Sequence, residues 1–427
     1  MNLTDLGRPA FAAACIAVAL LPACGGGGDT AQASGAATRS HVMNGVGSGG
    51  TGKVKSYAAG PIAGFGSIVV NGVHYEDGTA TIVDDDGLPR TTADLKLGGE
   101  VAIDAGPIVA GAAVANHIVI GSDIVGTVDQ AWDAVSGTLR VMGQPVAVTG
   151  GTVLDAWPGG PAAIPPGALV EVSSLYDPSS GVYAATRIDP RLPTLAFKTR
   201  GAVAALDGKA KTFRIGSQVF AFGAIAGAPK LKNGQLVCVD VQLVPNAAGQ
   251  WAVTSFLNAA GAPADGVHAE VEGSASAVGD PAHFTVAGLA VDATRAKFSP
   301  PGTVVVDGTN VSVKGSMAGG VLVASSVDLE DDGFGDGQGG HGGDSGGKGH
   351  GGHGPRGAIT LAGPLLAAPD AANQRFVVRG PTTVDHAGAR FVGGSAAELA
   401  AGRVVAVTGR LSADGSRVVA SEVRLTP

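Results

Sequence analysis

The sequence is poor in aromatic side chains, in charged side chains and in cysteine. Of its 427 residues 4% are aromatic and 15% are charged, and the formal net charge at pH 7 is −8. Nucleic-acid binding depends mainly on clustered Lys and Arg, and stacking on single strands needs exposed aromatic rings. This composition therefore argues against a nucleic-acid partner.

Motifs that indicate catalysis are also missing. The chain has no Gly-x-Ser-x-Gly nucleophile elbow, no His-Glu-x-x-His metal motif and no phosphate-binding loop that ends in Lys. The scattered Asp and Glu residues are better explained as polar residues of strand faces and turns than as catalytic groups. We therefore expect no enzymatic activity, no catalytic residues and no bound cofactor.

Glycine and apolar residues, in contrast, are abundant. The chain holds 70 glycines and 45% hydrophobic residues, with many valines. β-Branched residues suit a pleated sheet, and glycine suits turns that need a positive φ. A chain of this length exceeds one ordinary core. The composition predicts several all-β domains.

Two signatures recur five times in the same order. The first is Gly-x-x-Val-x-Val or Ile, beginning at Gly98, Gly167, Gly234, Gly308 and Gly402. The second follows 16 to 19 residues later. It consists of Ala or Val, a small polar residue, any residue and an apolar residue, in 115–118, 185–188, 253–256, 324–327 and 420–423. A hairpin-like stretch with a Gly precedes each first signature. The order predicts five repeated modules.

Each module has room for about five short strands, and a closed barrel removes exposed strand edges. We therefore predict tandem small five-stranded OB-like barrels, each with its own core. An open sandwich shared between modules would give the same alternation. The predicted modules are residues 57–122, 123–190, 198–260, 266–330 and 357–427.

The N-terminus resembles the signal segment of bacterial lipoproteins. Arg8 precedes an apolar run from Ala10 to Leu21, which is too short to span a bilayer. The tetrapeptide 21–24 resembles a lipobox, which implies removal of residues 1–23 and lipid on Cys24. Residues 24–56 then form a disordered tether. An ordinary secretory signal with an incidental cysteine is the alternative.

The resemblance implies contact with the membrane through the N-terminal lipid. Because Gly25 and not Asp follows Cys24, the sorting rule for such lipoproteins implies the outer membrane. Cys15 would leave with the signal, so Cys238 would be the free thiol of the mature chain. Its place in an alternating Val-rich stretch predicts a small buried strand residue without thiol chemistry.

Residues 331–356 are rich in Gly and His, and we predict a disordered linker between the last two modules. As an alternative, His341, His350 and His353 could bind a divalent metal such as Zn, Ni or Cu. The acidic turn 84–86 predicts a solvated hairpin tip, with a surface calcium contact as the alternative. Residues 328–333 imitate the start of a calcium loop but lack its final Glu.

The stretch 64–73, Gly-Phe-Gly-Ser-Ile-Val-Val-Asn-Gly-Val, with 49–52 before it, resembles the opening motif of an uncharacterised family of domains of unknown function. Its members are exported bacterial lipoproteins with OB-like repeats. The full motif occurs only in the first module. The resemblance implies a fold and a location but no activity.

These observations predict a lipid-anchored cell-envelope protein that binds or scaffolds an unidentified envelope protein or glycan. A metal-handling lipoprotein that uses the His-rich linker is the alternative.

Overall fold

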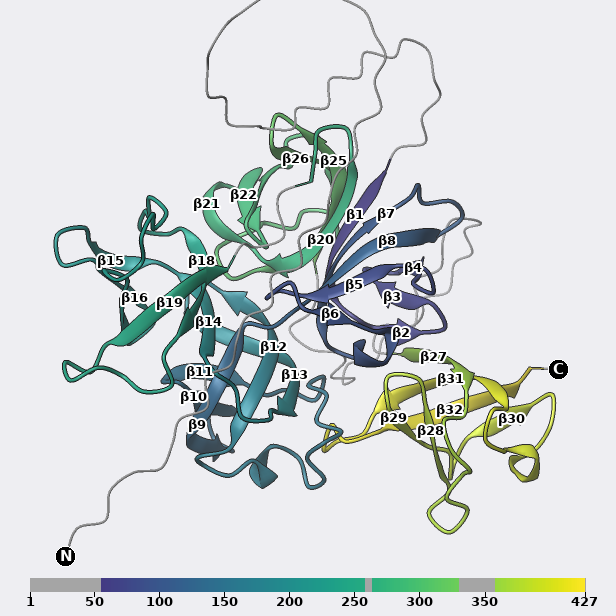
Figure 1. The fold of residues 1–427 in the computed structure, drawn as a ribbon. Coiled ribbons are helices and arrows are strands. Elements are labelled where there is room, and N and C mark those ends of the chain that lie inside the picture. Colours follow the sequence, from purple (N-terminus) through teal and green to yellow (C-terminus); the bar gives the residue numbers. More distant parts are fainter. Residues whose placement is uncertain (1–54, 258–262, 330–357, 427) are drawn as a thin grey trace, which may run out of the picture. The chain divides into compact units, whose positions relative to one another are not determined.

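The fold is known from a computed structural model, which describes residues 55–257, 263–329 and 358–426. These residues form strands β1 to β32 and three single-turn 3-10 helices (Figure 1): η1 (Thr92–Asp94), η2 (Pro161–Ala163) and η3 (Ala396–Glu398). In this part of the chain no helix has the length and apolar character needed to cross a membrane. The prediction of an all-β chain is confirmed.

Module 1 contains the first eight strands. In it β1 pairs with β7, β7 with β8, β8 in parallel with β4, and β4 with β3. Strand β3 pairs with β2, which follows β1 after two residues, so the ring closes. The strands are β1 (Ser56–Pro61), β2 (Gly64–Phe65), β3 (Ile68–Val70), β4 (Val73–Glu76), β5 (Thr81–Asp84), β6 (Pro89–Arg90), β7 (Glu100–Ala105) and β8 (Ala112–Gly121).

Module 2 is a closed ring of five strands. Strand β9 pairs with β10, β10 with β11, β11 in parallel with β13, β13 with β12, and β12 with β9. The strands are β9 (Ile124–Asp133), β10 (Thr138–Val141), β11 (Gln144–Ala147), β12 (Leu169–Asp177) and β13 (Val182–Pro190).

Module 3 repeats this order with its first strand in two pieces. The parallel pair is β17 with β19, and β14 pairs with β18. The strands are β14 (Phe197–Ala202), β15 (Ala204–Asp207), β16 (Thr212–Ile215), β17 (Gln218–Ala221), β18 (Leu236–Val241) and β19 (Trp251–Leu257).

Modules 4 and 5 have the same order, with β23 and β29 parallel to the last strands β26 and β32. Module 4 contains β20 (His268–Ser274), β21 (Ser276–Asp280), β22 (His283–Val286), β23 (Leu289–Asp292), β24 (Lys297–Ser299), β25 (Asn310–Ala318) and β26 (Val321–Leu329). Module 5 contains β27 (Ile359–Pro364), β28 (Arg375–Val378), β29 (Thr382–Asp385), β30 (Arg390–Val392), β31 (Val404–Leu411) and β32 (Val418–Leu425).

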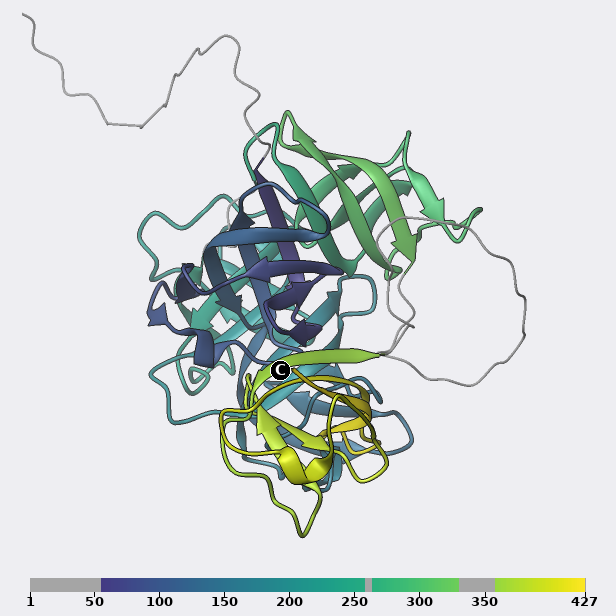
Figure 2. The ribbon, with the colours of Figure 1, turned by 90° about the vertical axis from the view of Figure 1, so that its right-hand side faces the viewer.

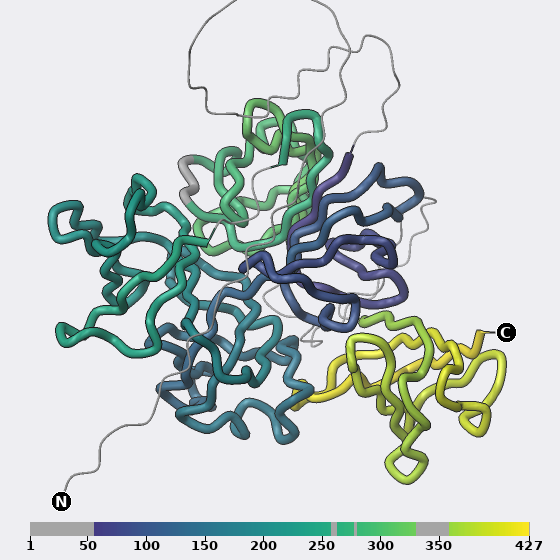
Figure 3. Tube along the Cα trace, viewed as in Figure 1, coloured from purple at the N-terminus to yellow at the C-terminus, as the bar shows by residue number. Residues whose placement is uncertain are grey.

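The common order is first, second, third, fifth, fourth and back to first, which is the order of an OB barrel. Figure 3 follows the chain through the five modules from purple to yellow. The predicted fold class of tandem OB-like barrels is confirmed. The predicted residue boundaries of the modules remain predictions.

The glycine of the first signature has one conformation in all five modules. Its φ is 75° at Gly98, 82° at Gly167, 83° at Gly234, 86° at Gly308 and 80° at Gly402. Each of these glycines donates its N–H, at 2.8 Å, to a carbonyl of its own module that lies within the first strand (Val128) or directly after its first segment (Ile62, Val203, Ala275 and Leu365). A side chain would strain this left-handed turn, which explains why the sequence repeats glycine there.

The second signature is a β-bulge. In each module the register between the fourth and fifth strands shifts by one residue at the small polar position. The extra residues are Asn116, Thr186, Thr254, Ser325 and Ser421. The hydroxyls of Ser325 and Ser421 donate to carbonyls of the partner strand. The bulge bends the long fifth strand around the barrel.

The cores are not separate. One buried cluster contains side chains of modules 1 and 5, a second contains those of modules 2 and 3, and a third joins module 4 to Tyr57 and Ala59 of β1. Backbone pairing also crosses modules, because β1 pairs with β20, β14 with β9 and β2 with β27. Figure 2 shows the purple module 1 between the green module 4 and the yellow module 5. The expectation of one independent core per module is wrong for the described residues.

Candidate functional site

The residues predicted to carry lipid or metal lie outside the described part of the chain. They are Cys24, His341, His350 and His353. Among the residues that the structure does describe, no group of three or more His, Cys, Asp or Glu side chains could hold a metal ion. The described site is therefore built from other residues.

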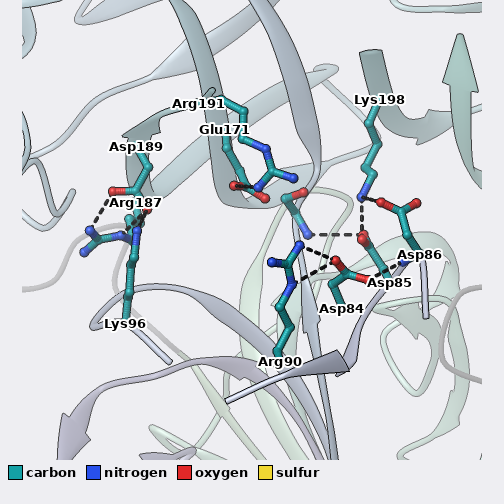
Figure 4. A network of polar contacts seen from close by, with 11 residues as sticks. Asp84, Asp85, Asp86, Arg90, Lys96, Glu171, Arg187, Asp189, Arg191 and Lys198 are labelled. Carbon is teal, nitrogen blue, oxygen red and sulfur yellow. Dashed lines mark hydrogen bonds and ion pairs between the residues drawn. The ribbon is translucent and has the colours of Figure 1, made fainter. Parts of the chain in front are cut away.

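The acidic turn after β5 is the part of this site that the sequence pointed to. Asp84 is 9% exposed and accepts hydrogen bonds from the backbone N–H groups of Asp86 and Leu88. Its Oδ2 also accepts hydrogen bonds from Nε and Nη2 of Arg90, at 3.0 and 2.5 Å. Asp85 forms an ion pair with Lys198 of module 3 (Figure 4). The prediction of a solvated tip is wrong for Asp84 and Asp85, because cations neutralise both carboxylates in a buried corner.

A second group of charges centres on Arg187 of β13. Its Nη2 lies 2.6 Å from Asp155 and 2.6 Å from Asp189, and its Nη1 donates to the Leu97 carbonyl of module 1 at 3.1 Å. Lys96 of module 1 also reaches Asp189, at 3.0 Å (Figure 4). Burial raises the pKa of Asp189, but the hydrogen bonds and charges of Arg187 and Lys96 outweigh burial and hold it below its usual value. The Lys96–Asp189 ion pair and the Arg187–Leu97 hydrogen bond therefore join modules 1 and 2.

A third group lies where the chain passes from module 1 to module 2. Asp123 is 2% exposed and forms an ion pair with Arg200 of β14 at 3.0 Å. Burial is the main reason why the pKa of Asp123 is raised. Glu100 is nearby on β7, and its Oε2 is buried without a hydrogen-bond partner among the described residues. Burial and the charge of Asp123 raise the pKa of Glu100 to about 8. We infer that Glu100 is neutral at pH 7.

Cys238 faces this third group from β18. It is 5% exposed and unpaired, and burial raises the pKa of its thiol to about 12. A thiol with so high a pKa is a poor nucleophile at neutral pH. The prediction of a small buried strand residue agrees with this environment.

The first two groups line a cavity of about 120 Å³. Its charged wall consists of Asp84, Asp85, Asp86, Arg90, Asp94, Lys96, Glu171, Arg187, Asp189, Arg191 and Lys198. All of these except Asp94 take part in ion pairs, and Asp94 accepts the N–H and hydroxyl of Thr91. Such a wall can hold water or a small polar molecule, but its charges already neutralise each other.

Sequence reasoning missed most of these partners. Arg187, Lys198 and Arg200 stand in strands whose alternation gave no sign of burial. The acidic partners of Lys198 and Arg200 come from other modules, and Arg187 reaches module 1 through the Leu97 carbonyl. The only local signal was the run of three aspartates at 84–86.

No curated protein matches the chain. A solved structure titled "drosophila Unr CSD456" is similar over 56% of this chain and 99% of its own, with 12% identity and a TM-score of 0.13.

Two segments, residues 125–189 and 363–424, match the family model described as Domain of unknown function (DUF5666). The first segment covers most of module 2 and the second most of module 5. The chain therefore carries two domains of the DUF5666 family.

Proposed function

We propose that this protein is a lipid-anchored, non-catalytic protein of the bacterial cell envelope whose OB-like modules bind or scaffold another envelope component. Lipid on Cys24 anchors it in the outer membrane. The partner is an envelope protein or a glycan.

The observation that carries the proposal is the pairing of charged side chains around the cavity of about 120 Å³. The ion pairs Asp85–Lys198 and Lys96–Asp189 each join two modules. Arg187 satisfies two aspartates and a carbonyl of module 1 at once. Side chains paired in this way hold modules together, whereas a catalytic base or nucleophile needs a free, accessible group. The pairing supports an architectural role.

The shared cores point in the same direction. Buried clusters that continue from one module to the next make relative motion of those modules costly. A body of this kind can present its surface loops in fixed positions to a partner.

The experiment compares wild-type protein with Cys24→Ala in cells that receive a radiolabelled fatty acid. Wild type should take up the label, fractionate with the outer membrane and form a reproducible crosslinked adduct with an envelope protein or glycan. Cys24→Ala should be soluble, unlabelled and free of that adduct. The matched control Cys238→Ala should behave as wild type, since Cys238 is buried. Lipid label on Cys24→Ala, or wild type that yields no adduct, would contradict the proposal.

Metal handling is the second candidate function, favoured by three histidines within residues 341–353. The metal would bind to these histidines, which lie outside the described residues.

A further inference from the structure

We infer that the motif Gly64-Phe65-Gly66 of module 1, together with Asp77, is a docking site for module 5 of the same chain, and that this site holds module 5 without a covalent connection. The partner is residues 359–425. The connection between the two parts runs through residues 330–357, which are outside the described ones.

The backbone contact is a strand addition. Gly64 and Phe65 of β2 pair in parallel with Thr360 and Leu361 of β27. Strand addition uses main-chain hydrogen bonds for affinity and neighbouring side chains for specificity. β2 thus provides a strand edge with which β27 of module 5 can pair.

Glycine at position 64 makes this approach possible. A Cβ there would lie 2.5 Å from the Thr360 carbonyl oxygen, whereas the nearest atom of module 1 would be Val69 Cγ2 at 3.5 Å, an ordinary contact. At Gly66 a Cβ would lie 3.3 Å from the Ala362 Cβ. Gly64 therefore serves the contact with module 5 and not the fold of module 1.

Phe65 and Asp77 provide the specific part of the site. Asp77 is 4% exposed, and both of its oxygens accept the guanidinium of Arg379. The same guanidinium lies 5.5 Å from the centre of the Phe65 ring. Gly380 packs on that ring, because a Cβ there would lie 2.4 Å from it. A two-pronged Arg–carboxylate pair over an aromatic ring fixes orientation as well as affinity.

Module 2 also contributes contacts to the docking site of module 5. The N–H of Leu154 donates to the Gly415 carbonyl of module 5 at 2.7 Å. Buried side chains of modules 1 and 5 also form one continuous cluster with Val153. Since modules 2 to 5 lack the full Gly-Phe-Gly motif, module 1 is the place where this site occurs.

The test uses the full chain with a specific protease site inserted between Gly346 and Gly347, cleaved after folding. Native mass spectrometry and size-exclusion chromatography should show both fragments in one particle. After cleavage, Gly64→Ala should release the C-terminal fragment, whereas the control Gly78→Ala should not, because a Cβ at Gly78 meets nothing within 4 Å.

Arg379→Met provides a second variant that keeps the packing of the long side chain. It should raise the dissociation rate of the cleaved protein roughly tenfold or more, since Asp77 loses its partner in a buried position. Circular dichroism of each uncleaved variant verifies that it is folded. Release of the fragment from the cleaved wild type, or equal retention by Gly64→Ala and Gly78→Ala, would overturn the inference.

Discussion

At the scale of single residues, the structure is governed by charges that pair across modules. Arg187 and its two aspartates of module 2 are buried together, and Lys96 of module 1 pairs with one of them, Asp189. Each charge needs the others, because an isolated buried charge costs several kcal/mol. Glu100 is different: its buried oxygen has no donor among the described residues, and its pKa is raised to about 8. Burial therefore favours the protonated form of the Glu100 carboxyl group.

Glu100→Gln should remove a pH dependence of stability. Glu100 faces Asp123, Asp85, Arg200 and Lys198. Because its pKa is higher in the folded state, its favourable contribution is complete below about pH 4.5 and is lost as the pH rises through about 8. Wild type should lose about 1.4 kcal/mol of unfolding free energy between pH 7 and 9, and Glu100→Gln should lose much less.

Urea unfolding at each pH measures this difference. Glu76→Gln, an exposed change in the same module, is the control and should follow wild type. Asp240, whose pKa burial raises to about 6, titrates below this window. A Glu100→Gln variant whose stability falls as steeply as that of wild type would show that another group titrates.

At the scale of elements, each module is defined by a left-handed glycine turn and a bulged fifth strand. The strands between them bury alternate residues, and Val170, Val237 and Val405 are all buried, as their positions in the repeat predict. Val170 and Val237 belong to one cluster, although they lie in different modules.

Val170→Asp should destabilise modules 2 and 3 together. A carboxylate in place of a fully buried valine should cost about 2 to 5 kcal/mol. Because the cluster is shared, hydrogen exchange should accelerate in β18 of module 3 as well as in β12. The control Val135→Asp alters a side chain that is 96% exposed and should change neither. Acceleration confined to module 2 would show that its core is independent after all.

At the scale of the whole molecule, the second candidate function, metal handling, is assigned to residues 341–353, which lie outside the described modules. Isothermal calorimetry of the mature protein with Zn, Ni and Cu should show micromolar binding if the alternative function holds, because three imidazoles can converge on one ion. The matched variant lacks residues 331–356. Equal heats from both proteins would exclude the His-rich tract as the site.

The sequence by itself determined the local features of this protein. The left-handed turns at five glycines, with φ between 75° and 86°, and the five bulges at small polar residues can be recognised in the sequence. Each turn or bulge depends on one residue and its neighbours. Alternation of valines similarly marks which strand face is buried. The fold class could therefore be predicted.

Only the tertiary structure decided which modules share a core and which charges are buried. Arg379 and Asp77 are 302 residues apart in the chain, and the sequence around either residue does not predict its partner. Asp84 and Asp85 look like any exposed acidic turn until Arg90 and Lys198 are placed beside them. Burial of a charge is a property of everything packed around it, so short-range pattern cannot specify it.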